Sequence, residues 1–345
     1  MEIIVRQVEA RSERNVLIPF LLKYLSPHAD AQRFDWLYLA NPHGLAKAWV
    51  ASQGKTGRIV GVAAAFPRQI CRSGGSARGW VLGDFCIHPD HRTMGPALAL
   101  QRACLEDLSK GEQSFCFDFP SLSMLAVYKR LRIEATEKMI RFAKPLRVDR
   151  KVAEKIPIRR IARGVSALAN AGLKLGDRFL SKTRDLIIAT EPGPWGEEFT
   201  QTTSEWARTE DIRVARTGPY LNWRFGQHPV RPHRMLTARE RGTLCGFLVY
   251  ECAGQDGYIV ELHARNDVAR KALLGSAIEI AREEGVHTFN APWLSAHRGR
   301  ELLENYGFRP REWTPVVVLE LRQNGKRRAN CKASEWFLTA GDRES

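Results

Sequence analysis

Apolar and polar positions follow two different periods along this chain, and each change of period marks a predicted element. A period near two is typical of strands, and a period near 3.6 is typical of helices. In the first part of the chain the pattern predicts strands at 2–8, 46–52, 58–70, 79–87 and 114–119, and helices at 13–25, 96–110 and 123–131. A glycine-rich turn, "QGKTG", joins the second and third of these strands into a hairpin.

A similar order of elements occurs again in the second part of the chain. The segment "GRIVGVAAAF" (57–66) resembles "GTLCGFLVYE" (242–251), and "WVLGD" (80–84) matches "YIVEL" (258–262). In both places an expected helix, a short strand and another helix follow. This repeated alternation of strands and helices predicts an α/β fold with a mixed sheet.

A chain of 345 residues exceeds the usual size of one domain. We predict a first domain at 1–145, a basic helical linker at 146–190, a second domain at 191–322 and a loose polar tail at 323–345. Residues 144–185 contain twelve Lys or Arg against four Asp or Glu, with apolar residues at helical spacing. This composition is typical of a helix packed across a domain joint, or of a basic amphipathic helix on an anionic membrane.

Composition narrows the class of protein. Hydrophobic residues make up 44% and charged residues 26% of the chain, as in globular proteins. The net charge of +15 attracts polyanions such as nucleic acid, acidic lipid headgroups or phosphorylated cofactors. The seven cysteines are odd in number and form no CxxC pair, which excludes a complete disulfide framework. Because no signal peptide pattern and no run of roughly 18 apolar residues is present, we predict a cytoplasmic location.

The turn between the strand at 79–87 and the helix at 96–110 has the composition of an anion site. A helix N-terminus carries unpaired N–H groups and a partial positive charge. In "HRTMGPA" (91–97), Gly95 has no Cβ and lets a phosphate approach the backbone, while Arg92 adds charge-assisted hydrogen bonds. The turn therefore fits a diphosphate, and an ordinary Gly-Pro turn is the alternative.

These residues resemble a known family. The run Arg92-Thr93-Met94-Gly95-Pro96-Ala97 is similar to the R/Q-x-x-G-x-G/A pyrophosphate loop of the GCN5-related N-acetyltransferases. The resemblance implies two domains of this type, each a mixed, mostly antiparallel sheet flanked by helices. It also implies acetyl-CoA or another acyl-CoA, held by these six residues and by the main chain of Cys86 and Ile87. The second copy lacks the loop spacing in "RNDVARKALLGSA", so we expect it to have lost cofactor binding.

Acyl transfer from a thioester to an amine requires a base, a proton donor for the thiolate and donors for the oxyanion. The family pattern makes Tyr128 the candidate proton donor, although Arg132 stands where the family has glycine. Asp84 is the candidate base or ammonium-binding group, because an unpaired carboxylate inside an apolar strand is unfavourable. Helix packing for Tyr128 and a structural pair with an arginine for Asp84 are the alternatives. Asp118 is a weaker candidate for the role given to Asp84.

Two aromatic residues are candidates for contact with the acceptor. Trp36 and Tyr38 precede a turn in the part of the chain that the family uses for the acceptor, and core packing is the alternative. A metal site at Cys86-x-His88-x-x-His91 lacks a fourth ligand, so we expect no metal.

We therefore predict an N-acyltransferase, and more specifically an acetyl-CoA-dependent N-acetyltransferase, acting on a primary amine of a small molecule or peptide. One alternative is a non-catalytic binding or scaffolding protein associated with a membrane or with polysaccharide machinery. Another is a relative of the tRNA-dependent aminoacyltransferases. We expect no specific nucleic-acid partner, because the sequence has no recognition motif. Contact of 144–185 with an anionic membrane and a homodimer are further expectations.

Overall fold

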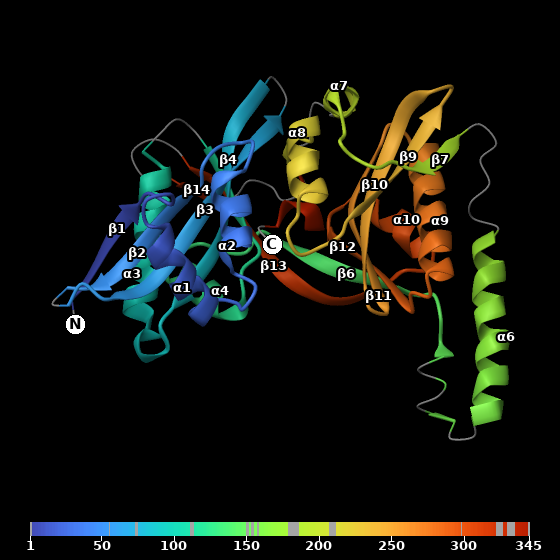
Figure 1. The fold of residues 1–345 in the computed structure, drawn as a ribbon, viewed down its shortest axis with the longest axis horizontal. Helices are drawn as coiled ribbons and strands as arrows, with labels where there is room; N and C mark the ends of the chain where they lie inside the picture. Colours follow the sequence, from blue (N-terminus) through green and yellow to red (C-terminus); the bar gives the residue numbers. More distant parts are fainter. Residues whose placement is uncertain are drawn as a thin grey trace.

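The computed structural model describes residues 2–54, 56–72, 75–110, 114–149, 152, 155–156, 159–178, 186–206, 212–297, 299–321, 327–329 and 335–343. In these residues, fifteen strands pair into one continuous sheet, and helices lie against both of its halves (Figure 1). The main path of the sheet is β1-β2-β3-β4-β5-β13-β6-β12-β11-β10-β9-β7. The mixed α/β architecture predicted from the sequence is confirmed.

The first half of the sheet is built from residues before 146. Its elements are β1 (Ile3–Val8), α1 (Arg14–Tyr24), α2 (Ala31–Phe34), the π-turn η1 (Asp35–Leu39), β2 (Lys47–Gln53), β3 (Ile59–Arg72), β4 (Gly75–Ile87), the 3-10 turn η2 (Pro89–His91), α3 (Met94–Leu108), β5 (Ser114–Asp118), α4 (Leu122–Arg130) and β6 (Glu137–Pro145). Strands β1 to β4 pair antiparallel, and β5 joins β4 in parallel. Helix α3 buries its apolar stripe against β2 and β3, as the 3.6-residue pattern predicts.

The second half repeats much of this order. Its elements are α6 (Arg159–Arg178), β7 (Ile187–Thr190), α7 (Glu197–Glu205), β8 (Ile212–Val214), α8 (Gly218–Leu221), the π-turn η3 (Asn222–Gly226), β9 (Arg234–Glu240), β10 (Thr243–Ala253), β11 (Asp256–Ala264), α9 (Asp267–Glu283), β12 (Thr288–Leu294), α10 (Arg300–Asn305), β13 (Arg309–Leu321), β14 (Arg327–Ala329), β15 (Trp336–Phe337) and the 3-10 turn η6 (Ala340–Asp342). Hairpin, strand, helix, strand, helix and strand therefore occur in both halves. None of the described helices has the length and apolar character needed to cross a membrane.

The two halves exchange their last strands. Strand β13 enters between β5 and β6, with Val317 opposite Asp118, while β6 pairs with β12 of the second half. Figure 1 shows β6 and β13 crossing the middle of the molecule together. Residues Val316 and Val318 of β13 are buried in the core of the first half. The predicted range 1–145 thus gives β6 to the other half of the sheet, and the range 191–322 gives β13 and also β8, which pairs with β3.

A pair of tryptophans joins the halves a second time. Trp36 of η1 and Trp223 of η3 stack with ring centroids 4.9 Å apart. Each indole N–H donates to the main-chain oxygen of the other tryptophan, at 2.9 Å in both cases. Both lie in a π-turn that follows one α-helical turn, and a proline, Pro42 or Pro229, comes six residues after each tryptophan. This second repeat relates the two halves across their joint.

Part of the predicted polar tail is buried between the halves. Trp336 packs against Phe115 and Phe117 of β5, and Leu338 is fully buried. Asp342 is also fully buried and forms an ion pair with Arg216. Residues 335–343 are therefore not a loose tail, because apolar and charged side chains both find partners in the core.

Candidate active site

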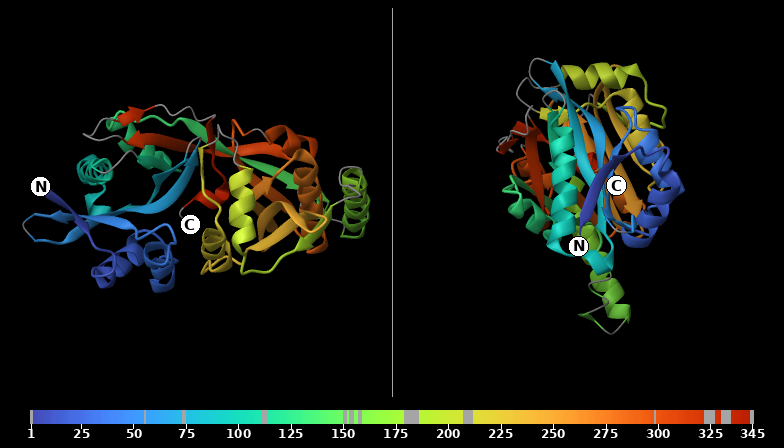
Figure 2. Two further views of the ribbon diagram at one scale, coloured as in Figure 1. Left: turned by 90° about the horizontal axis from the view of Figure 1, so that it is seen from above. Right: turned by 90° about the vertical axis from the view of Figure 1, so that its left-hand side faces the viewer.

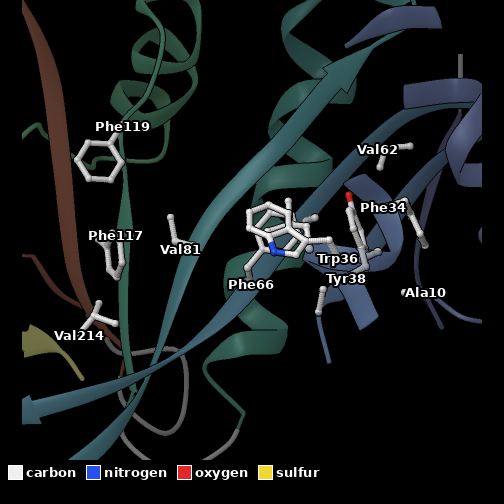
Figure 3. Packing of buried hydrophobic residues seen from close by; sticks show 14 of the residues in the cluster. Ala10, Phe34, Trp36, Tyr38, Val62, Phe66, Val81, Phe117, Phe119 and Val214 are labelled. Atoms are coloured by element: carbon white, nitrogen blue, oxygen red, sulfur yellow. The ribbon is translucent and has the colours of Figure 1, made fainter. Parts of the chain in front are cut away.

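Strands β4 and β5 separate in the middle of the first half. Their parallel pairing ends at Val81 and Phe117, and β5 then continues beside β13. Val81, Phe117 and Phe119 pack in one apolar cluster at this point (Figure 3). The rest of β4 remains paired to β3 on one side only. Its main-chain groups on the other edge are therefore available to a ligand.

A β-bulge lies on this open part of β4. The register changes between Val62 opposite Cys86 and Ala64 opposite Gly83, and Asp84 within the bulge has φ +46°. The amide of His88 donates to the main chain of β3, and successive amides of a strand point to opposite sides. The amide of the preceding residue, Ile87, is thereby directed to the open edge.

The thiol of Cys86 does not have the properties of a nucleophile. The residue is buried, and burial raises the pKa of its thiol to about 12. A reactive cysteine needs the opposite change, since the thiolate is the attacking species. Any part that Cys86 takes in binding is left to its main chain, as the sequence predicts.

The predicted anion turn lies between η2 and α3. Arg92 and Gly95 are exposed, whereas Pro96 and Ala97 are buried beneath the first turn of α3. The side chain of Thr93, at the N-cap, does not cap the helix, so the first amides of α3 keep their N–H groups free. A Cβ built on Gly95 would meet nothing within 4 Å, so the space over the turn is open.

The same turn is tied to the open edge of β4. The Nε of Arg92 donates to the main-chain oxygen of Ile87 at 3.2 Å. The exposed part of the predicted loop, residues 92–95, therefore forms a surface beside the end of β4. This surface offers main-chain N–H groups and one guanidinium to an anion.

The two histidines of this region stabilise the turn. The Nδ1 of His88 accepts from the amide of Asp90, and its Nε2 lies 3.1 Å from a guanidinium nitrogen of Arg58. His91 closes η2 through a main-chain bond to His88. Within the described residues, no three His, Cys, Asp or Glu side chains are arranged to hold a metal ion.

Asp84 forms a buried ion pair. Its two carboxylate oxygens accept from Arg33 of α2 at 2.7 and 2.9 Å, and the second oxygen also accepts from the hydroxyl of Tyr38 at 2.9 Å. Its side chain is only 2% exposed. Tyr38 is fully buried against Phe34 (Figure 3), and burial followed by the Asp84 charge raises the pKa of its hydroxyl well above the usual value. The structure thus joins two predicted site residues, with Arg33 as a third member that sequence reasoning missed.

Tyr128 and Asp118 form a second buried pair. The Tyr128 hydroxyl donates to Oδ2 of Asp118 at 2.6 Å, and the tyrosine is fully buried in the packing of α4. Burial, followed by the Asp118 charge, raises the pKa of the hydroxyl well above its usual value. Asp118 is the last residue of β5, so the pair lies where β5 has separated from β4. The role of proton donor for Tyr128 stays a prediction.

Trp36 lies at the joint between the halves. It is largely buried by Trp223, and its ring also lies 4.6 Å from that of His228. Its role in acceptor binding stays a prediction.

Comparisons with known proteins bear on the fold. No protein-family model matches the chain, and no curated protein matches it in sequence. Among solved structures, a conserved protein of unknown function from Enterococcus faecalis, a probable N-acyltransferase, matches with TM-score 0.68 and 15% identity over 93% of this chain and 73% of that one. A GCN5-related N-acetyltransferase from Anabaena variabilis matches with TM-score 0.63 and 13% identity over 92% and 73%.

An acyltransferase that uses a longer acyl group has the same architecture. The N-myristoyltransferase of Saccharomyces cerevisiae, solved with bound myristoyl-CoA, matches with TM-score 0.53 and 14% identity over 92% of this chain and 82% of that one. At identities this low, the structural likeness establishes the fold alone. The chemistry has to be argued from the residues described above. The chain has the fold of the GCN5-related N-acetyltransferase superfamily.

Proposed function

We propose that this protein is an N-acyltransferase that moves an acyl group from acyl-CoA to a primary amine, with acetyl-CoA as the expected donor. The observation that carries the proposal is the uncapped start of α3 beneath the open space at Gly95, tied by Arg92 to the unpaired edge of β4. A diphosphate fits such a helix start, because free N–H groups and the helix dipole both favour negative charge.

The residues around this surface would have separate roles in binding and catalysis. Amides at the start of α3 and Arg92 would hold the diphosphate, and the Ile87 amide would face the oxygen of the reacting carbonyl. The neutral amine nitrogen forms a bond to that carbonyl carbon and loses a proton to water, the carbon–sulfur bond breaks, and the departing thiolate takes a proton. Tyr128 is our candidate for supplying that proton, and its hydroxyl, which donates to Asp118 here, would have to turn toward the thiolate to do so.

Asp84 fits a positioning role better than the role of a base. Its carboxylate already accepts three hydrogen bonds, and its side chain has almost no contact with solvent. The ion pair with Arg33 fixes helix α2 against the bulge of β4, and so holds the Ile87 amide in place.

The second half differs at the corresponding helix start. Helix α9 is capped by Asn266, whose side chain accepts from the amide of Ala269 at 2.9 Å. Asp267 adds a negative charge to its first turn, where a phosphate would be repelled. We therefore propose that only the first half binds the acyl donor.

Binding of acetyl-CoA to the full chain tests this function directly. A native-state ligand at a hundred times its Kd should stabilise the protein by about 2.7 kcal/mol, seen as a higher melting temperature. Calorimetry should give one site per chain, and thiol release from acetyl-CoA should depend on an added amine. Longer acyl chains, tested in the same assays, define the donor. Absence of both a melting shift and binding heat would remove the proposal and favour the scaffolding or tRNA-dependent alternatives.

We also propose that α6 makes peripheral contact with an anionic membrane. The helix lies at the outer end of the second half, away from the joint (Figure 2). Its polar side faces the chain: Ser166 is buried, and Asn170 accepts from the amide of Val148. Ile161 and Leu168, on another side of the helix, are 51% and 78% exposed. A helix that turns apolar residues outward is typical of a surface-binding helix.

The charge of α6 agrees with this partner. Arg160, Arg163 and Lys174 are exposed on the helix, whose first turn has no acidic residue. Basic residues near an anionic bilayer contribute about 1 kcal/mol each.

Vesicle sedimentation tests the membrane proposal. The full chain should pellet with phosphatidylcholine vesicles that contain phosphatidylserine, and much less with phosphatidylcholine alone. Replacing Ile161 and Leu168 by serine should reduce pelleting to the phosphatidylcholine level. Leu122→Ser is the matched control, because Leu122 is also 78% exposed but lies on α4. Equal pelleting of the Ile161/Leu168 variant and the unchanged protein would refute the proposal.

A further inference from the structure

A cavity of about 710 Å³ lies away from the α3 surface, between the second half and the crossing strands. Its walls come from η3 and the following residues 228–233, from β6, β10, β11, β12 and β13, and from the segment 340–343. The volume is in the range of cavities that bind small molecules. Phe225, Tyr258 and Trp313 give it aromatic walls, while four arginines and two glutamates line it together.

Arg224 is the buried cation of this cavity. It is 3% exposed, and its Nε and Nη2 donate to the main-chain oxygens of Gly341 and Arg343 at 2.8 and 2.9 Å. Its Nη1 is buried without a hydrogen-bond partner, and no carboxylate in the described part of the chain forms an ion pair with it. A buried charge without a counter-ion is strongly unfavourable, so an anion in the cavity would relieve it.

The other charges of the cavity do not supply that anion. Glu251 pairs with Arg231 at 2.9 Å. Glu312 pairs with Arg141. Arg343 forms no ion pair with a described acidic residue, so it and Arg224 leave an excess of positive charge.

The pKa shifts of Arg224 and of the nearby histidines agree with this excess of positive charge. Burial, with Arg68 and Arg231 acting in the same direction, lowers the pKa of Arg224 to about 10, although Tyr220 and Asp342 oppose the shift. Burial also lowers the pKa of His228 to about 2 and of His233 to about 3, and Arg224 adds to both shifts. The histidines are therefore neutral near pH 7. Nδ1 of His233, whose side chain is 4% exposed, is another polar atom without a partner.

One residue of the cavity lining, Arg343, also contacts the first half. The guanidinium of Arg343 lies over the ring of Phe119, 5.3 Å from its centroid. Phe119 follows Asp118, the last residue of β5 and the hydrogen-bond partner of Tyr128. Arg343 therefore lies between the cavity and the end of β5.

We propose that this cavity binds the anionic group of the acceptor, a carboxylate or a phosphate, through Arg224 and Arg343. The inference rests on the proposed acyl transfer, because it identifies the occupant as the acceptor amine. The substrate class is then an amine that also carries an acidic group, with the acid held in the second half and the amine directed to the first.

Calorimetric titration of the full chain with matched amines tests the inference. The probes are β-alanine, O-phosphoethanolamine and the uncharged ethanolamine. At least one acidic amine should bind ten times more tightly than ethanolamine, and the stronger of the two identifies the anionic group. The preference for the acidic amine over ethanolamine should decrease as the salt concentration rises, because it depends on electrostatic attraction.

Two variants locate the binding. Arg343→Met should remove most of the preference, and Arg224→Met should remove it entirely, with circular dichroism to confirm folding. Arg231→Met is the control, because Glu251 already neutralises Arg231, and the preference should change less than twofold.

The outcomes separate this inference from the proposed function. If acidic amines bind through Arg224 but acetyl-CoA does not bind, the cavity is an anion site and the acyltransferase proposal fails. If acetyl-CoA binds but ethanolamine equals the acidic amines, or if both arginine variants keep the preference, the inference is overturned.

Discussion

Arg92→Ala combined with Gly95→Asp should abolish the rise in melting temperature that acetyl-CoA produces, while the protein without ligand melts as before. The new carboxylate would occupy the space where the diphosphate is expected, and its charge would oppose the phosphates. Nothing lies within 4 Å of a Cβ at Gly95, so the fold has room for the side chain. We expect at least a hundredfold weaker binding, which corresponds to about 2.7 kcal/mol at 25 °C.

Calorimetry with acetyl-CoA measures this loss, and two controls define its cause. Gly95→Ala adds bulk without charge and should weaken binding less than the double change. Gly196→Asp places the same carboxylate at the start of α7, where a Cβ also meets nothing, and should leave binding unchanged. Undiminished binding by the double variant would show that the α3 turn does not hold the diphosphate, and the proposed function would lose its main support.

Asp84→Asn should lower the free energy of unfolding by about 3–5 kcal/mol, because it removes the carboxylate charge from a buried ion pair with Arg33. Asparagine tolerates the positive φ of this position and has the size of aspartate, so the change removes little besides the charge. The midpoint of denaturant unfolding measures the effect. Transfer activity should fall as well, because the pair fixes α2 against the bulge of β4.

Asp35→Asn is the matched control for this prediction. Asp35 forms an equally close two-point ion pair with Arg14, at 2.7 and 2.8 Å, but its side chain is 49% exposed. Exposed pairs contribute about 0–1 kcal/mol, so the two variants should differ severalfold. A similar small effect for both would mean that Asp84 is not a structural anchor. A stable Asp84→Asn protein without activity would restore the role of base.

Local signals predicted a large part of the fold. The apolar run at residues 79–87 and the period of 3.6 in residues 96–110 correspond to β4 and α3, because both signals depend only on neighbours along the chain. The anion turn was predictable for the same reason. Its chemistry needs only adjacent residues, from Arg92 to Ala97, at a strand-to-helix junction.

Partners that lie far apart in sequence were not predictable in this way. Nothing in the pattern of Trp36 shows that it stacks on Trp223, 187 positions later. The sequence offered an arginine as the partner of Asp84 but did not show which one, because Arg33 is one of many arginines in the chain. The Arg224 cavity gave no sequence signal, because its walls come from seven separate segments.

The sequence by itself determined the strands, the helices, the repeat of their order and the loop of the candidate acyl-donor site. Tertiary structure alone decided that β6 and β13 exchange halves, that Asp84 is neutralised by Arg33, and that Arg224 is buried with no paired carboxylate among the residues that the structure describes. The physical reason is that periodicity records which side of an element is buried. The choice of partner on that side is made by long-range packing and by the balance of charges that folding brings together.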